Sequence, residues 1–270
     1  MVWLQYLLPQ HLLSRMMFRF TRIENTFIKN NFISWFIKSY QVDLSEAVKD
    51  NAKDYKNFNE FFTRKLKTKA RVIEDGKIVC PVDGSVSQLG YIKDSKILQA
   101  KGHLFTVNKL LAEDSRSVKY SNGFFATIYL SPKDYHRIHM PYDGVLNSMT
   151  YIPGDLFSVN SNTTNRVDGL FARNERVVCY FETEFGQCAL ILVGAIFVGS
   201  MQTVWHGQIT PPYKKKMQIY DYKDRQIKFK KGDEIGRFNM GSTVIMLMPN
   251  NSNKFTLDES QLVRMGQSIV

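Results

Sequence analysis

The chain has 270 residues, of which 44% are hydrophobic and 13% aromatic, and its 36 Lys plus Arg against 25 Asp plus Glu give a formal net charge of +11. We find no low-complexity tract and no internal repeat, so the composition excludes a mostly disordered chain and predicts one sizeable core. The positive surplus favours an anionic partner, either nucleic acid or anionic lipid, without choosing between them.

The three cysteines, Cys80, Cys179 and Cys188, have no C-x-x-C spacing. This pattern argues against a disulfide framework and a cysteine-rich zinc site, and it fits a reducing, cytosolic setting. The longest apolar run, residues 188–199, is shorter than the roughly 20 residues that a membrane-spanning helix needs. Its Gly and Val content suits a buried strand better, so the sequence predicts no transmembrane helix.

Residues 1–13 have no basic leader before their apolar residues, and Pro9 interrupts them early. We therefore expect no cleaved signal peptide. From Leu12 to Phe36, apolar residues recur at helical spacing with arginines and lysines among them, which is typical of basic amphipathic helices. Such helices either pack on a core or lie in a membrane interface with their apolar face in the acyl boundary. The charge surplus favours the membrane.

A further basic helix is predicted for residues 57–71. From about Lys77 onward, short runs rich in Val, Ile, Tyr and Phe alternate with turns such as Asp-Gly and Asn-Gly, which is typical of β-strands. The predicted strands are 85–91, 123–130, 144–152, 176–182, 188–198 and 243–248. Helices followed by strands indicate an α+β fold. We therefore predict N-terminal amphipathic helices within residues 1–72, followed by a β-rich core with short helices in residues 73–270.

The stretch Pro211 to Lys231 concentrates eight cations in an otherwise polar segment that starts with two prolines. Most such runs are solvated loops or edge strands, and this is the favoured interpretation. A contact with lipid headgroups is the alternative.

Residues 131–141 read SPKDYHRIHMP. Ser131 is a good N-cap, Pro132 suits the first helical position and Asp134 completes a capping-box pattern, so a short helical turn is predicted. His136 and His139 would then share one face of the turn, whereas in a strand they would point to opposite faces. Such a pair can act as acid and base, bind a metal or simply lie at the surface. A metal is the weakest interpretation, because no other Cys or His cluster supplies ligands.

The stretch CPVDGSVSQLG, residues 80–90, places Asp83 before Gly84 between β-forming residues. The commoner interpretation of this dipeptide is an ordinary hairpin turn. The alternative is catalytic, because a carboxylate can hold an imidazole in the correct tautomer and stabilise its protonated form. The motif alone does not decide between the two.

The stretch GRFNMGSTVIMLMP, residues 236–249, contains a strand that is apolar on both faces, which predicts a buried central strand after Ser242. Gly241 lies at the mouth of this strand. Glycine leaves the carbonyl carbon of the Gly241–Ser242 bond sterically open and tolerates unusual backbone angles, so the Ser242 hydroxyl can attack it. A plain Gly-Ser turn before a strand is the commoner case.

The combination is more informative than its parts. Asp83 in PVDGSVSQLG, His136 and His139 in YHRIHMP, and Gly241-Ser242 in MGST closely resemble, in this order, the bacterial phosphatidylserine decarboxylases. The family commonly has leucine where this chain has methionine before Gly241, and the two are close in volume, so we expect little consequence. Further similar stretches, which extend the resemblance over nearly the whole chain, are FNEFFTRKL (58–66), ILQAKGH (97–103), YIPGDLFSVN (151–160), LFARNERV (170–177), LVGAIFVGS (192–200) and TVWHGQITPP (203–212).

The resemblance implies a proenzyme that cuts its own backbone between Gly241 and Ser242. His139, oriented by Asp83, takes the proton from Ser242, whose oxygen attacks the Gly241 carbonyl and converts the amide to an ester. Elimination and loss of ammonia then leave a covalent pyruvoyl group at Ser242. The implied products are a β chain, residues 1–241, and an α chain, residues 242–270.

The resemblance also implies a second reaction at residue 242. The pyruvoyl ketone forms a Schiff base with the amine of phosphatidylserine and accepts the electrons left as carbon dioxide departs, which gives phosphatidylethanolamine. No metal and no added cofactor are implied. His136 is the candidate for assisting decarboxylation or proton transfer, and a role in positioning the substrate is equally compatible with the sequence.

A diacyl substrate stays in the bilayer, so the enzyme must dock on it. The resemblance therefore implies a peripheral protein at the cytoplasmic face of the cell membrane, with residues 1–72 as a membrane-docking segment on anionic lipid and residues 73–270 as the catalytic domain. The implied partners are phosphatidylserine, the membrane surface and the two fragments as an α/β heterodimer. A further homo-oligomer stays open, and nucleic acid is not expected.

Two other classes of function stay open. A serine hydrolase with an Asp83, His139 and Ser242 triad would leave the chain whole, and the sequence lacks its G-x-S-x-G elbow. A non-enzymatic basic lipid-binding protein would keep its binding without Ser242 or His139 and show strongly salt-dependent binding. His103 lies in a family-like stretch, but no physical argument assigns its role.

Overall fold

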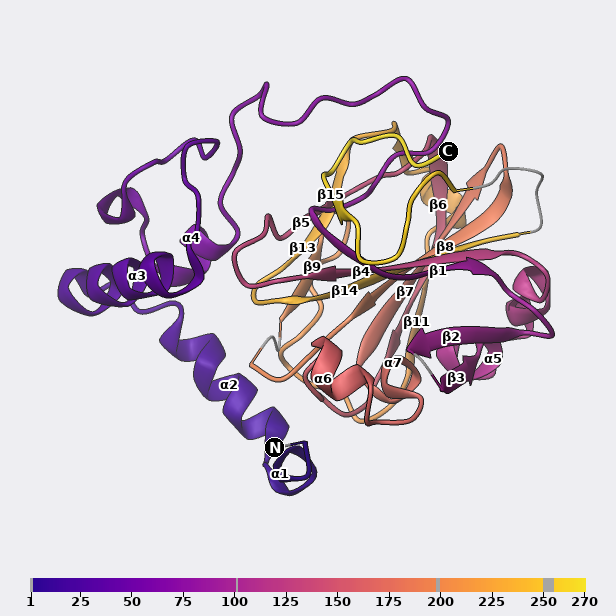
Figure 1. The fold of residues 1–270 in the computed structure, drawn as a ribbon, viewed down its shortest axis with the longest axis horizontal. Helices are drawn as coiled ribbons and strands as arrows, with labels where there is room; N and C mark the ends of the chain where they lie inside the picture. The colour runs from indigo at the N-terminus through magenta and orange to yellow at the C-terminus, as the bar shows by residue number, and fades with distance from the viewer. Residues whose placement is uncertain (1, 101, 198–199, 250–254) are drawn as a thin grey trace.

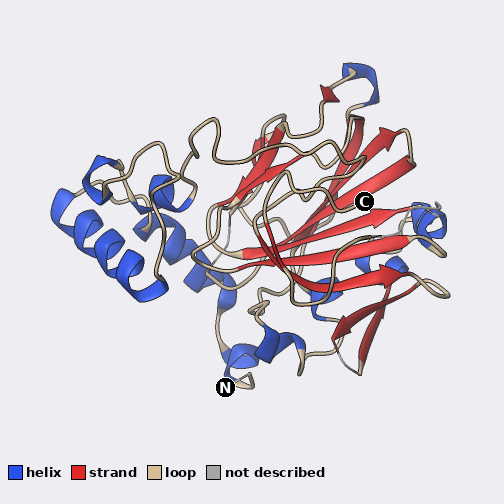
Figure 2. Cartoon of the chain, turned by 45° about the horizontal axis from the view of Figure 1, so that its top comes forward, coloured by secondary structure: helices blue, strands red, loops and turns tan. Residues whose placement is uncertain are grey.

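The computed structural model describes residues 2–100, 102–197, 200–249 and 255–270. A helical N-terminal part lies beside a body built mainly of strands (Figure 1), and Figure 2 shows the strands gathered in that body. The α+β prediction is confirmed. Within these ranges, no helix combines the length and the apolar character needed to cross a membrane. Val198, the last residue of one predicted strand, and parts of two family-like stretches lie outside the described residues.

The amphipathic region between Leu12 and Phe36 forms two helices, α2 (Gln10–Phe20) and α3 (Thr26–Tyr40). The helix is interrupted between them because Asn25 is the N-cap of α3. Its side chain accepts hydrogen bonds from the backbone N–H groups of Phe27 and Ile28. The other helical segments of the N-terminal part are α1 (Leu4–Leu7), η1 (Ala52–Asp54) and α4 (Phe58–Phe62).

Helix α4 is much shorter than the predicted helix 57–71. It buries Phe58, Phe61 and Phe62 against the apolar side of α3. The prediction is wrong beyond Phe62 because the following lysines are exposed and offer no apolar face to bury, and a helix without tertiary packing is not stable at this length. The backbone instead pairs with residues 46–48, where Val48 N–H donates to the Lys65 carbonyl at 2.9 Å.

The body is built from antiparallel strands, and five of the predicted strands are confirmed as β1, β4, β6, β7 and β14. The strand predicted for 188–198 ends at Val193, because its neighbour begins at Arg176, opposite Val193, and leaves no partner beyond that point. The bounds of the strands are β1 (Gly84–Tyr91), β2 (Lys96–Ala100), β3 (His103–Thr106), β4 (Phe124–Leu130), β5 (Arg137–His139), β6 (Gly144–Ile152), β7 (Arg176–Thr183), β8 (Gly186–Val193), β9 (Met201–Thr203), β10 (Gly207–Gln208), β11 (Gln218–Asp221), β12 (Lys228–Phe229), β13 (Glu234–Phe238), β14 (Ser242–Met248) and β15 (Leu262–Val263).

The large sheet has the order β11-β6-β7-β8-β14-β4-β1-β15, with β12 also paired to β6. Strand β14 has a partner on both sides and is buried along its whole length, so the predicted central strand is confirmed. A second sheet has the order β10-β9-β13-β5, and β2 pairs with β3. The short helical segments of the body are α5 (Val107–Leu110), η2 (Ser115–Tyr120), α6 (Ser161–Thr164), α7 (Leu170–Arg173) and η3 (Lys223–Arg225).

The candidate residues lie at one edge of the large sheet, namely the edge formed by the ends of its strands and not by an outermost strand. Strand β4 ends at Leu130, opposite Ser242 at the start of β14. Strand β1 begins beside the same end of β4, so Gly84 lies in a strand rather than in the hairpin turn of the commoner interpretation. A Cβ on Gly84 would lie 2.3 Å from the Tyr129 carbonyl oxygen, so the close approach of these strands requires glycine. Asp83 and Gly241 both immediately precede strands at this edge.

The predicted helical turn around the two histidines is wrong. Half of the capping box forms, since Ser131 N–H donates to the Asp134 carboxylate at 2.7 Å, but no helix follows. Residues Arg137–His139 form β5 and pair with β13, and pairing between strands overrides the local helix signal. His136 therefore precedes the strand and His139 ends it.

Candidate active site

Ser242 lies at the start of a fully paired central strand. Its side chain is buried, and its Oγ has no hydrogen-bond partner among the described residues. A buried hydroxyl without a partner costs about 1–3 kcal/mol, so its presence calls for an explanation other than stability. The preceding residue lies beside His136, because a Cβ on Gly241 would meet the Leu130 carbonyl oxygen at 3.5 Å and His136 Nε2 at 3.7 Å, both ordinary van der Waals distances.

His136 lies beside the Gly241–Ser242 peptide bond and has one ring nitrogen without a hydrogen-bond partner among the described residues. Its Nδ1 donates to the Asp134 carbonyl at 2.8 Å, which leaves the lone pair on Nε2. This Nε2 has no partner among the described residues, and the ring packs on Phe62 with centroids 4.1 Å apart. Complete burial, helped by the charge of Arg64, lowers the pKa of His136 to about 3. The imidazole is therefore neutral at physiological pH.

His139 has a different environment, with partners for both ring nitrogens. Its Nδ1 donates to the Gly232 carbonyl at 2.7 Å, so its Nε2 accepts a hydrogen bond from the Tyr135 hydroxyl at 2.9 Å. Burial lowers the pKa of His139, against the Gly232 hydrogen bond and the charge of Glu234, which raise it. Burial raises the pKa of Tyr135, which keeps its hydroxyl protonated as the donor.

Asp83 is held by a cation rather than by a histidine. Arg71 contacts both carboxylate oxygens, with Nε 2.9 Å from Oδ1 and Nη2 bonded to Oδ2. The backbone N–H of Met265 donates to Oδ1 at 2.8 Å, and Arg71 also reaches Glu46 at 2.7 Å. Because the ion pair is nearly buried, removing one partner leaves the other charge uncompensated.

The uncleaved chain therefore brings the candidates to one edge but does not connect Asp83, His139 and Ser242 by hydrogen bonds. Strand β4 lies between β14 and β1, so Asp83 is separated from Ser242 by two strand spacings, roughly 10 Å. The side chain beside Gly241 that carries a proton-accepting nitrogen is His136. Asp83 and His139 are close enough for the negative charge of Asp83 to raise the pKa of His139 slightly.

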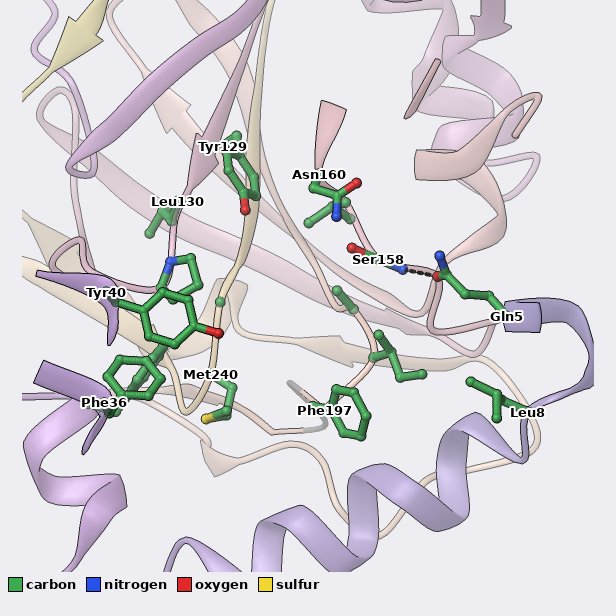
Figure 3. Close-up of a pocket in the computed structure, with 16 residues that line it drawn as sticks. Gln5, Leu8, Phe36, Tyr40, Tyr129, Leu130, Ser158, Asn160, Phe197 and Met240 are labelled. Carbon is green, nitrogen blue, oxygen red and sulfur yellow. Dashed lines mark hydrogen bonds between the residues drawn. The ribbon is translucent and has the colours of Figure 1, made fainter. Parts of the chain in front are cut away.

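A cavity of about 610 Å³ adjoins the Gly241 side of this edge. Its size falls in the range of small-molecule sites, and its walls are mostly apolar. Figure 3 shows that residues from distant parts of the chain surround it, with Met240 on one side and the Leu8 and Gln5 side chains on another. The residues that line it are Gln5, Leu8, Phe36, Tyr40, Phe62, Tyr129, Leu130, Pro132, Ser158, Val159, Asn160, Ala195, Ile196, Phe197, Met240 and Gly241.

The N-terminal helices are attached to the cavity loops by polar contacts. A side chain before α2 and two on it accept hydrogen bonds from backbone N–H groups of those loops: Gln5 from Ser158 at 2.8 Å, Gln10 from Leu156 at 2.5 Å and Ser14 from Phe197 at 3.2 Å. Figure 3 draws the first of these contacts. The N-terminal part is thus a wall of the cavity as well as a candidate docking segment.

Comparison with known proteins identifies the family. The family model of phosphatidylserine decarboxylase matches residues 58–270, and a second model, described as PSD, matches residues 1–41. The first match alone spans well over half of the sequence. The chain belongs to the phosphatidylserine decarboxylase family.

Curated relatives agree with this family over almost their whole length. The phosphatidylserine decarboxylase proenzyme of Methylobacillus flagellatus is 51% identical over 93% of this chain and 90% of its own. The proenzyme of Methylococcus capsulatus is 50% identical over 98% of this chain and 94% of its own. That of Shewanella amazonensis is 50% identical, with 98% and 95% covered.

Three further residues lie next to the candidate site and could not be singled out from the sequence: Arg64, Arg71 and Tyr135. Tyr135 adjoins His136, and that position was its only signal. The two arginines lie in a stretch of exposed lysines. Only the use of Arg in place of Lys indicates a buried side chain there, because a guanidinium suits buried hydrogen bonds and ion pairs better than an ammonium. Arg64 is 5% exposed and donates through Nη2 to the Lys133 and Asp134 carbonyls at 2.7 and 3.3 Å. It thus supports the carbonyl that orients His136.

The remaining residues that could bind a metal or react as nucleophiles are the chain's potential metal ligands and its three cysteines. Among the residues that the structure describes, no three His, Cys, Asp or Glu side chains are close enough together to hold a metal ion. The three cysteines are free and buried, and burial raises the pKa of each thiol. They are therefore inert core residues at neutral pH.

Proposed function

We propose that this chain is a self-cleaving proenzyme whose product decarboxylates phosphatidylserine at a membrane surface. Membership of the family supports the reaction, and one feature of the structure supports the site. A buried Ser242 hydroxyl, which has no hydrogen-bond partner in the described part of the chain, follows Gly241, which lines an apolar cavity. The relatives are named as proenzymes of the same activity. The buried nucleophile, the adjacent glycine carbonyl and the cavity together support self-cleavage and decarboxylation at this site.

The proposed self-cleavage needs only the atoms of residues 241 and 242, a base and one water molecule. The Ser242 oxygen attacks the Gly241 carbonyl carbon, its proton passes to a base, and the C–N bond breaks as the amine takes a proton. Loss of the Cα proton then breaks the Cβ–Oγ bond, which releases Gly241 as a carboxylate and leaves dehydroalanine. Its imine tautomer is hydrolysed by water, ammonia leaves, and residue 242 becomes a pyruvoyl group.

For the base in self-cleavage we assign His139, with Asp83 as its electrostatic partner. His136 is nearer to Gly241, but its pKa of about 3 makes its protonation near pH 7 cost roughly 5 kcal/mol. His139 is a better proton acceptor on this ground, and it becomes available when the Tyr135 hydroxyl releases its Nε2. Position therefore favours His136, whereas acid–base energetics favours His139. We assign to His136 the proton transfer or substrate contact of decarboxylation.

The residues fit a carbonyl at position 242. Among the described residues, the Ser242 oxygen makes no hydrogen bond that its departure with Gly241 would break, and Gly241 lines the cavity. A pyruvoyl ketone there supplies an electron sink for the carboxylate carbon of an amine-bearing substrate. The apolar walls exclude water and contact the acyl and glycerol part, while the neutral His136 accepts a hydrogen bond through its Nε2.

The fragments are expected to stay together as an α/β heterodimer. Residues 242–248 form β14, which pairs along its whole length with β4 and over residues 243–247 with β8 inside the sheet. Cutting before Ser242 leaves these ladders intact. Separating the fragments would expose a fully buried strand of which residues 244–248 are all apolar, and this loss of apolar burial strongly opposes separation.

A diacyl substrate places this enzyme at the membrane, and the N-terminal part supports that location. Large apolar side chains there are exposed, among them Trp3, Leu7 and Phe27. The net charge of +11 favours an anionic leaflet. We therefore propose a peripheral protein at the cytoplasmic face of the cell membrane, with residues 1–72 docking on anionic lipid and residues 73–270 carrying the chemistry.

A serine hydrolase that acts on other molecules is disfavoured. Its nucleophile must be accessible and must contact its base, but Ser242 is fully buried and has no hydrogen bond to either histidine. Burial suits attack on the adjacent peptide bond instead, because the nucleophile and the carbonyl belong to neighbouring residues.

The test is conversion of phosphatidylserine in vesicles by the purified full chain, followed as phosphatidylethanolamine and carbon dioxide. The wild type is expected to form both, and Ser242→Ala is expected to form neither. Thr243→Val is a matched control, because Thr243 carries a neighbouring buried hydroxyl without a hydrogen-bond partner among the described residues. Equal turnover by Ser242→Ala, or release of fatty acid in place of carbon dioxide, would contradict the proposal.

A further inference from the structure

The N-terminal helices expose a row of apolar side chains. On α2, Leu12, Met16 and Phe20 are spaced by four residues, so they follow one face of the helix. All three are exposed, and on the preceding segment Trp3 and Leu7 are exposed to 82% and 86%. Contiguous exposed apolar surface of this kind marks a site of interaction.

A loop from far along the sequence lies against the same helix. The Tyr213 ring lies 5.0 Å from the His11 ring, and the Arg15 guanidinium lies 5.4 Å from the centre of the Tyr213 ring. The residues that follow Tyr213 are three lysines and a methionine, of which Lys215, Lys216 and Met217 are exposed. The fold thus places part of the basic stretch 211–231 beside the apolar row of α2.

The combined surface carries cations almost without acids. The sequence has no Asp or Glu before Glu24, and residues 213–217 contain none. The acidic neighbour of His11 in this region is Asp155, which forms an ion pair with Arg173 at 3.2 Å. Arg15, Arg19 and the exposed lysines are therefore available to an anionic partner.

We propose that residues 213–217 and the helices α1 and α2 form one docking surface for an anionic phospholipid bilayer, in which the apolar row enters the acyl boundary and Lys215 and Lys216 contact headgroup phosphates. This inference rests on the proposed function and extends it to a segment outside residues 1–72. A bilayer is the occupant because the surface joins exposed apolar side chains with cations, whereas nucleic acid would use the cations alone.

The position of this docking surface relative to the cavity supports the same occupant. The segment that exposes Trp3 and Leu7 also supplies Gln5 and Leu8 to the cavity lining. The segment that would enter the bilayer therefore also forms part of the cavity wall. The loop 213–217 fixes which face of α2 points to the headgroups, because it packs on His11 and Arg15.

The experiment measures binding of the full chain to phosphatidylcholine vesicles with and without phosphatidylglycerol. The test variant is Lys215→Gln with Lys216→Gln, and the matched control is Lys223→Gln with Lys228→Gln, two exposed lysines of the same basic stretch on η3 and β12. We expect the test variant to bind anionic vesicles more weakly by roughly fivefold for each lysine removed. The control is expected to bind like the wild type.

A second variant separates the apolar contribution. Met16→Gln keeps helix propensity and is expected to weaken binding at high salt as much as at low salt, whereas the loss in the lysine variant disappears at high salt. Self-cleavage, read by intact mass, is expected to be unchanged in all three variants, which reports correct folding. Binding does not depend on turnover, so a protein that binds as predicted but forms no phosphatidylethanolamine contradicts the proposed function alone.

Two outcomes would overturn the docking surface. One is an equal loss of vesicle binding in the test and control pairs, which would reduce the effect to net charge. The other is unchanged vesicle binding by the test pair together with weaker binding to a short DNA duplex, which would assign these lysines to nucleic acid.

Discussion

His136 and His139 lie three residues apart in the chain but in two different surroundings. The region of His136 is fully buried beside Gly241, and it contains a ring nitrogen and a serine oxygen that have no partners among the described residues. The region of His139 is a hydrogen-bonded network in which Tyr135 and Gly232 occupy both ring nitrogens. His136 is thus the histidine beside Gly241 but has a pKa lowered to about 3, whereas His139 lies in a network that occupies both of its ring nitrogens.

The largest expected effect tests this division between the histidines. His139→Ala is expected to slow self-cleavage by about 10²–10⁴-fold, the usual contribution of a general base. His136→Ala is expected to cut its backbone but to lose phosphatidylethanolamine formation. Gel analysis of fragment formation measures the first property, and vesicle turnover of material that has already cleaved measures the second. The reverse pattern would show that position outweighs the low pKa of His136.

A second prediction concerns Asp83 and its cation. Asp83→Asn and Arg71→Gln each remove one partner of a nearly buried ion pair, so each is expected to lower the free energy of unfolding by about 3 kcal/mol. If Asp83 also acts on His139, only Asp83→Asn slows self-cleavage beyond what the stability loss explains. Denaturant titration and cleavage rates on both variants make the comparison, and identical cleavage rates would restrict Asp83 to a structural role.

A third prediction uses the acid response of His136. Its pKa is lowered to about 3 in the folded chain, from 6.5 when unperturbed. Between these values the unfolded chain binds a proton that the folded chain does not, so the free energy of unfolding falls as the pH drops below 6.5. At about pH 5 the loss from this residue amounts to roughly 2 kcal/mol.

The measurement compares Ser242→Ala with Ser242→Ala/His136→Gln, so that both chains stay whole. Between neutral pH and about pH 5, the chain that keeps His136 is expected to lose about 2 kcal/mol of stability relative to the His136→Gln chain, since only the first carries the His136 penalty. His11, His139 and His206, whose pKa values are also lowered, contribute equally to both. A constant difference across this range would show that His136 is not buried as a neutral base.

The smallest effect is expected from Tyr135. Tyr135→Phe removes the hydroxyl that donates to His139 Nε2, at a cost of about 1 kcal/mol of stability. Because the released nitrogen is then free to accept a proton, self-cleavage is expected to be as fast as in the wild type or a few times faster. A large decrease in rate would show that the hydroxyl itself carries the proton.

The sequence predicted the strands well and the helices less well, for physical reasons. Strand periodicity at β6 and β14 reflects burial in the sheet, which the final fold keeps. At residues 131–139 the local capping signal is real, since Ser131 and Asp134 do bond, but pairing of β5 with β13 overrides it. At residues 63–71, helix-forming lysines lack a buried face, so propensity alone does not form a helix.

Some members of the candidate site could be predicted from the sequence, but their hydrogen bonds and ion pairs could not. Gly241, Ser242 and His136 stand out by type and order, and the structure brings them together. The pairing of Asp83 with Arg71 could not be read from the sequence, because several basic residues precede it and only tertiary packing selects one. The cavity is equally invisible, since its lining comes from segments as distant as Gln5 and Gly241 and follows no local pattern.

Intact-mass analysis of the purified full chain under denaturing conditions shows whether the bond between Gly241 and Ser242 breaks. We expect two fragments, residues 1–241 and 242–270, the smaller beginning with a keto group that reacts with a carbonyl reagent. We expect one uncut chain for Ser242→Ala and normal cleavage for Thr243→Val. A wild-type protein that stays whole, with an ordinary serine at position 242, and still converts phosphatidylserine would contradict the account.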